Sequence, residues 1–66
     1  MGSFAVFHNG KQIRVFGFEL FSFRDRERAK RLAFELAQKN TDQGYPCSVE
    51  EFGSSGRFGT LVFSPK

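Results

Sequence analysis

The residue types that usually carry catalysis are scarce in this chain. It has one histidine, His8, and one cysteine, Cys47, whereas a structural zinc site takes four ligands. A catalytic histidine needs a nucleophile or a carboxylate close by, and the residues around His8 supply neither. Glu50 and Glu51 are adjacent, and adjacent strand residues point to opposite faces, so they cannot form one acid–base pair. We therefore expect no enzyme activity, no metal and no cofactor, with Cys47 buried as a small apolar side chain and His8 exposed beside a turn.

Basic residues are concentrated in one short stretch, where five of the eight residues from 24 to 31 are Lys or Arg. On a helix with about 100° per residue, Arg24, Arg28 and Arg31 lie on one side, opposite an apolar stripe. One interpretation is a binding face for phosphates or for an acidic protein surface. The other is a solvated face on which acids at helical spacing, such as Glu27, neutralise the cations. The sequence alone leaves both interpretations open.

Phenylalanine is unusually frequent, with ten Phe among 66 residues, one Tyr and no Trp. A domain of this length has a small interior, and a single core contributes only about 3–5 kcal/mol. We therefore expect some rings to lie at the surface, beside the ten Lys and Arg that give the chain a formal net charge of +3 at pH 7. Exposed aromatic residues next to basic ones indicate a contact surface rather than a catalytic pocket.

Phe34 is the exception within the helical stretch, because it falls outside the apolar stripe. It either packs under a neighbouring loop or against the end of the second strand, or it is an exposed hot spot for a partner.

The first hairpin offers a second candidate surface. Phe7, Phe16 and Arg14 are expected to share, with Gln12, the face that points away from the core. Aromatic rings beside arginine on an open sheet suit the stacking of nucleic-acid bases. The alternatives are that the polar stems cover these rings, or that the face pairs with a second subunit.

Strands 3–8 and 11–21 are predicted around Asn9-Gly10, the dipeptide favoured in two-residue hairpin turns. A two-residue loop would pair Val6 with Ile13 and Phe4 with Val15, so that these four residues form the core face. Beyond Gly17 the chain is expected to turn inward again, at the residues Phe18, Leu20 and Phe21.

A helix over 23–40 is predicted from Ser22, which has the spacing of an N-terminal cap with Asp25. Its apolar stripe is Ala29, Leu32, Ala33, Leu36 and Ala37. Strands 45–52 and 57–63 follow, joined by a turn at 53–56, and the core is completed by Phe58, Leu61, Val62 and Phe63. The fold class is therefore α+β, with ββαββ order: one antiparallel four-stranded sheet and a single amphipathic helix packed on one face, in one domain spanning 1–66.

The compartment and partners follow from composition. A lone cysteine in so small a domain is typical of a reducing compartment. No apolar stretch approaches the roughly 18 residues of a membrane span. We expect a cytoplasmic protein with no membrane contact.

The ββαββ order and the charged, alanine-spaced run from Ser22 to Ala37 resemble those of short proteins encoded by phages and other mobile elements. Such proteins include anti-CRISPR proteins and inhibitors of host RNA polymerase. The resemblance implies a non-enzymatic, stoichiometric inhibitor of a host machine that handles nucleic acid, acting by protein–protein contact. Direct binding of DNA or RNA is the alternative, and a self-associating homodimer is a further one.

Overall fold

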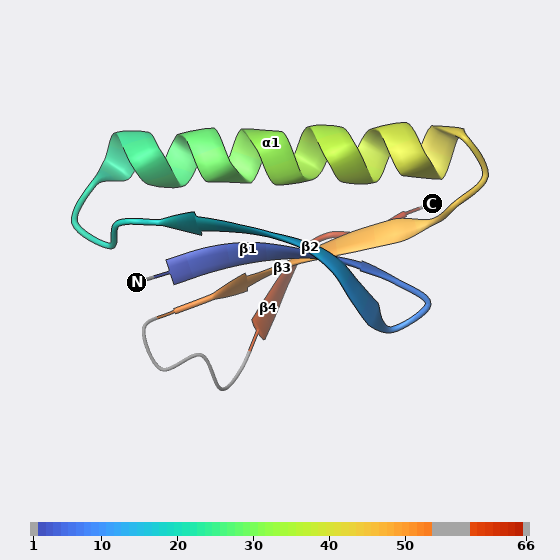
Figure 1. The fold of residues 1–66 in the computed structure, drawn as a ribbon, viewed down its shortest axis with the longest axis horizontal. Helices are drawn as coiled ribbons and strands as arrows, with labels where there is room; N and C mark the ends of the chain where they lie inside the picture. Colours follow the sequence, from blue (N-terminus) through green and yellow to red (C-terminus); the bar gives the residue numbers. More distant parts are fainter. Residues whose placement is uncertain (1, 54–58, 66) are drawn as a thin grey trace.

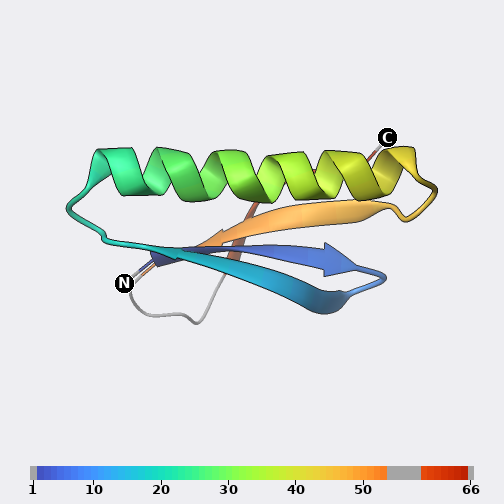
Figure 2. The same cartoon turned by 45° about the horizontal axis from the view of Figure 1, so that its top comes forward.

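One helix lies across one face of a four-stranded antiparallel sheet (Figure 1 and Figure 2). The computed structural model describes residues 2–53 and 59–65. The elements in chain order are β1 (Gly2–His8), β2 (Lys11–Phe18), α1 (Phe23–Asp42), β3 (Cys47–Phe52) and β4 (Gly59–Phe63). The strands lie in the order β2-β1-β3-β4, with every neighbouring pair antiparallel. The predicted α+β fold with ββαββ order is therefore confirmed.

Several predicted boundaries move by a few residues. The second strand ends at residue 18 instead of 21, the third begins at 47 instead of 45, and the helix continues to 42 instead of 40. Residues 54–56 of the predicted turn, and 57–58 of the predicted fourth strand with Phe58, lie outside the described residues.

The first hairpin turns where the sequence predicts it. Asn9 and Gly10 both have positive φ, at 53° and 76°, as a two-residue type I′ loop requires. His8 pairs with Lys11 and Phe7 pairs with Gln12, which is the predicted register. The turn chemistry of the sequence is thus sufficient to start the hairpin.

A bulge then changes the register of β2. The pairing shifts between Val6 and Phe7, so that Val6 faces Arg14 and Phe4 faces Phe16, and Ile13 is the extra residue. Because side chains alternate along a strand, this one-residue shift exchanges the two faces of β2.

The consequence is that part of the predicted core is wrong. Ile13 and Val15 are each 45% exposed instead of buried. Phe16 takes their place on the helix side of the sheet, where it packs against the core.

Local signals define both ends of α1. The Ser22 hydroxyl oxygen accepts a hydrogen bond from the backbone N–H of Asp25 at 3.2 Å, which confirms the predicted N-terminal cap. At the other end, Gly44 has φ of 93° and donates its N–H to the carbonyl of Thr41. A glycine just past the end of a helix provides this left-handed conformation without strain.

The helix contacts the sheet through small side chains. Ala29, Ala33 and Ala37, four residues apart, are all buried, whereas Leu32 is exposed. The buried stripe is thus narrower than predicted. Alanine allows the helix backbone to approach the strands closely, and α1 contacts β1, β2 and β3.

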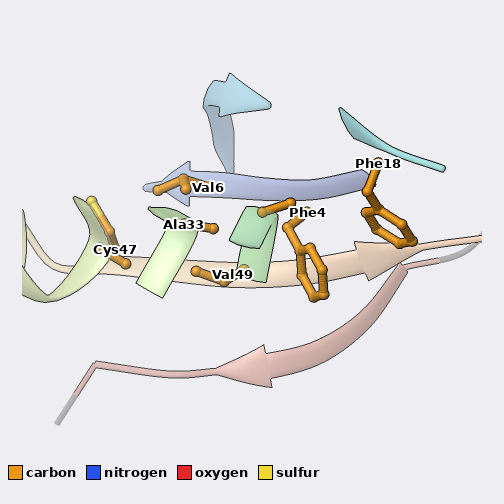
Figure 3. Close-up of a cluster of buried hydrophobic side chains, with 8 residues drawn as sticks. Phe4, Val6, Phe18, Ala33, Cys47 and Val49 are labelled. Atoms are coloured by element: carbon orange, nitrogen blue, oxygen red, sulfur yellow. The ribbon is translucent and has the colours of Figure 1, made fainter. Parts of the chain in front are cut away.

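The core between the helix and the sheet is small (Figure 3). Phe4 and Val6 come from β1, Phe18 from β2, and Cys47 and Val49 from β3. The Phe4 and Phe18 rings lie 5.3 Å apart between their centroids. Cys47 is buried with a free thiol, as expected, and its Sγ donates to the carbonyl of Tyr45 at 3.2 Å.

Apolar residues near the strand ends are more exposed than the sequence suggests. Leu20 and Phe21 do not turn inward, because β2 ends at Phe18 and the N–H of Ser22 bonds back to the carbonyl of Glu19 in a turn. In β4, a register shift leaves Leu61 exposed, while Val62 and Phe63 are half-buried against the core. Within residues 2–53 and 59–65, no helix is long and apolar enough to cross a bilayer.

Candidate binding surface on the helix

The three arginines singled out in the sequence lie together on the outer side of α1. Arg24, Arg28 and Arg31 line one shallow depression with Phe23 and Glu27, and its volume is about 400 Å³. We call these five residues the arginine surface. All three arginines are exposed, and the side of the helix that carries them is opposite the buried alanines. The predicted grouping of Arg24, Arg28 and Arg31 is thus confirmed.

One of the two interpretations left open by the sequence was that neighbouring acids neutralise these arginines, and the structure shows no direct ion pair of this kind among the described residues. In the part of the chain that the structure describes, Arg24, Arg28 and Arg31 form no ion pair with any acid. Glu27, which has the right spacing to pair with Arg31, instead contacts Arg26 at 3.1 Å. The arginine surface therefore presents three guanidinium groups whose donors are free to bind carboxylates or phosphates.

Arg26 differs from the other helix arginines because it points toward the sheet. Its Nε and Nη2 donate to the two carboxylate oxygens of Glu51 on β3, each at 2.9 Å, and its guanidinium lies 5.6 Å from the Phe4 ring centroid. The hydrogen bond to Glu51 raises the pKa of Arg26 above its ordinary value, although partial burial acts in the opposite direction. This bidentate ion pair connects the first turn of α1 to β3 and fixes the rotation of the helix about its own axis relative to the sheet.

Glu51→Gln is expected to lower the free energy of unfolding by about 1 kcal/mol. A glutamine has no charge, and its NH2 group takes the place of one carboxylate oxygen, so one of the two Arg26 donors would face another donor instead of an acceptor. The effect is modest because the side chains of Arg26 and Glu51 remain 34% and 25% exposed. Urea unfolding of the variant measures the loss, and Glu50→Gln is the matched control because Glu50 lies on the opposite face of β3. Equal unfolding midpoints for Glu51→Gln and the wild type would contradict the stabilising role of this pair.

The sequence reasoning missed the exposed aromatic rings at the N-terminal end of the arginine surface, Phe23 within it and Phe21 just before the helix. Phe21, which precedes the capping Ser22, is fully exposed. Phe23, the first residue of α1, is 75% exposed. Leu20 adds a further exposed apolar side chain. The signal in the sequence is the run of large apolar residues immediately before the capping Ser22, since the short connection from β2 to α1 cannot turn all of them inward.

Phe34 packs within the fold. The Phe34 ring centroid lies 5.3 Å from that of Phe63 on β4. The Lys30 ammonium group lies 5.8 Å from the centroid of the Phe34 ring. The side chain is half-buried. The packing interpretation of Phe34 thus describes its surroundings, although its neighbour is β4 instead of a loop or the end of the second strand.

The predicted stacking face on the hairpin is not assembled. The bulge in β2 places Arg14 and Phe16 on the helix side of the sheet, where the guanidinium lies 5.3 Å from the Phe16 ring centroid. Phe7 lies on the opposite side, where its ring is 6.4 Å from that of Phe52. The prediction that Phe7, Phe16 and Arg14 share one face is therefore wrong, because it assumed a hairpin without a bulge.

His8 is less free than expected. Its Nδ1 lies 2.7 Å from the carbonyl of Pro46, and its ring meets that of Tyr45 edge to face. It is half-buried and connects the hairpin tip to the segment before β3. Among the described residues, no group of three or more His, Cys, Asp or Glu could hold a metal ion.

Comparison of the chain with protein-family models, with curated proteins and with solved structures found no match in any of the three.

Proposed function

We propose that this protein is a non-enzymatic, cytoplasmic binding module that acts as a stoichiometric inhibitor of a host nucleic-acid-handling machine. It does so by protein–protein contact, with the arginine surface docking on an acidic patch of the partner. The inhibitory role is the one implied by the resemblance to small phage proteins. The contact surface is argued from the arrangement of the helix.

The observation that supports this proposal is the lack of internal partners for Arg24, Arg28 and Arg31 among the described residues, next to an exposed aromatic ring at Phe23. Arginine and aromatic residues are enriched at protein interfaces. The helix fixes the backbone positions of the three arginines relative to one another, so the ordering cost on binding is limited to their side chains, at about 0.5–1.5 kcal/mol each. An acidic patch on a partner matches this surface in charge.

Reversing two of these charges tests the proposal. We expect Arg28→Glu/Arg31→Glu to weaken capture of the partner from a bacterial host extract by at least about tenfold, since like charges at a docking site cost several kcal/mol. Lys11→Glu/Lys39→Glu changes the net charge by the same amount at exposed positions outside the arginine surface, and should leave capture unchanged. Quantitative pull-down with the immobilised chain measures both, and the complex should contain one copy of each component. Equal losses in the two variants, or no captured protein with the wild type, would overturn the proposal.

Direct binding of DNA or RNA is the second candidate, because guanidinium groups beside an exposed ring also suit a phosphate backbone and a stacked base. A fluorescent oligonucleotide, single-stranded or duplex, distinguishes the two candidates. Direct binding would appear at about 50 mM salt, and its affinity would fall steeply as salt is raised. Such binding, lost in Arg28→Glu/Arg31→Glu, would replace the protein partner with nucleic acid.

A further inference from the structure

The face of the sheet that points away from α1 forms a second surface. The strand registers place on it Ala5 and Phe7 of β1, Val15 of β2, Glu50 and Phe52 of β3, and Leu61 of β4. We call this the outer sheet face. Figure 2 shows α1 on the other side of the sheet, and no helix or strand among the described residues covers the outer one.

Apolar side chains gather on the outer sheet face. Phe7 and Phe52 meet with 6.4 Å between ring centroids, although their backbone positions are four residue pairs apart, each two pairs from the Ala5–Glu50 pair. The two rings thus close over Ala5, which is only 1% exposed despite lying on an uncovered face. Val15 and Leu61 flank this cluster on the two edge strands and remain 45% and 59% exposed.

Charge is almost absent from this surface. Glu50 is the one charged residue that the registers place on it within the described ranges. A Cβ atom at Gly59 would collide with the Glu50 carboxylate and the Phe52 ring, so the carboxylate leans over β4 toward the edge of the sheet. The carboxylate thus lies beside the Phe52 ring, and the other residues that the registers place on this face are uncharged. Depletion of charge with enrichment in aromatic residues marks the centre of protein interfaces.

The distribution of charge favours a second copy of the chain as the binding partner of the outer sheet face. A partner recognised by its charge would find no complement here, whereas the same apolar face on another copy is complementary in polarity. Six of the ten Lys and Arg lie on α1, and the strand pairing places Lys11 and Arg14 of β2 on the side of the sheet that faces α1. With two sheets packed about 10 Å apart, the arginine surfaces of two copies would be separated by well over the screening length of about 8 Å.

The size of the face is compatible with a weak dimer. Four strands spaced about 4.8 Å apart, with about six residues at about 3.3 Å each, give roughly 400 Å² in projection. The accessible area of a face covered with side chains exceeds its projection, and a standard interface uses about 800 Å² from each partner. This places the contact at the low end of specific interfaces, so that dimerisation would depend on concentration.

We propose that two copies of this protein associate through their outer sheet faces, sheet against sheet, with both helices outward. The Phe7–Phe52 clusters lie at the centre of the contact, and Val15 and Leu61 lie at its margins. The dimer would display two arginine surfaces facing opposite directions. This proposal concerns a different surface from the arginine surface, and it stands or falls independently of the partner proposed above.

Analytical ultracentrifugation of the isolated chain, from about 10 μM to about 1 mM, tests the proposal. The wild-type mass is expected to rise from 7.5 kDa toward twice that value. Val15→Lys should remain at the monomer mass throughout, because it removes an apolar side chain from the contact and places a positive charge at its margin on each copy. Leu32→Lys is the matched control: Leu32 is 41% exposed on the helix, and its replacement adds the same charge away from the outer sheet face.

Folding of each variant is checked by far-ultraviolet circular dichroism, and Leu61→Lys on the opposite edge strand provides a second disruption if Val15→Lys fails to fold. Loss of the dimer in a folded Val15→Lys or Leu61→Lys variant, with the Leu32→Lys variant still dimeric, would support the proposal. A wild-type chain that stays monomeric at about 1 mM would overturn it and leave the face for a different protein. Loss of the dimer only in Leu32→Lys would place the contact on the helix and would overturn it as well.

Discussion

Phe4→Ala is expected to leave this protein largely unfolded at 25 °C. Phe4 has no exposed surface, and its ring packs against the Phe18 ring and lies 5.6 Å from the Arg26 guanidinium. Removing a buried phenylalanine ring typically costs about 3–5 kcal/mol, because the apolar contacts are lost and a cavity remains. A single core in a chain of this length supplies about the same amount in total. The substitution therefore removes most of the free energy of unfolding.

Urea unfolding followed by circular dichroism measures this loss. Phe21→Ala is the matched control, since it deletes the same atoms from a ring that is fully exposed in the turn before α1. It should change the free energy of unfolding by no more than about 0.5 kcal/mol. A Phe4→Ala variant with the unfolding midpoint of the wild type would show that the core lies elsewhere.

Ala33→Leu is expected to have the second-largest effect, destabilising the fold by about 1–3 kcal/mol. Ala33 is the middle residue of the buried alanine stripe and is completely shielded between α1 and the sheet. Three additional carbon atoms at this position would force the helix away from β1 and β3, and would strain the Arg26–Glu51 contact as well. Thermal unfolding should show a lower midpoint.

Glu35→Leu separates this packing effect from a change in helix propensity. Glu35 lies on the same helix, two residues away and exposed, and Glu and Leu have similar intrinsic preferences for helix. We expect its unfolding midpoint to stay close to that of the wild type. If Ala33→Leu were equally harmless, the close approach of α1 to the sheet could not be a requirement of the fold.

Features of the candidate site were predictable to different degrees. The grouping of Arg24, Arg28 and Arg31 follows from helical geometry alone, and the structure places them around one depression. The separate role of Arg26 does not follow from helical geometry, because its partner Glu51 is 25 residues away in the sequence. The exposure of Phe21 and Phe23 also depends on where β2 ends, and the alternation pattern did not reveal that position.

The sequence by itself determined the features that depend on neighbouring residues. Asn9-Gly10 provides the positive φ angles of the turn, Ser22 caps α1, and the spacing of alanines selects the buried side of the helix. Each of these signals acts within a few residues along the chain. Together they are sufficient for the order of the five elements and for the α+β class.

Only the tertiary structure decided which face of β2 is buried. The bulge at Ile13 exchanges Val15 and Phe16, which moves one into the solvent and the other against the core. Both residues are apolar, so the alternation of the sequence is nearly as well satisfied by either register. The choice is made by the pairing of β2 with β1 under the helix, and it leaves the outer sheet face with the apolar surface on which the proposed dimer rests.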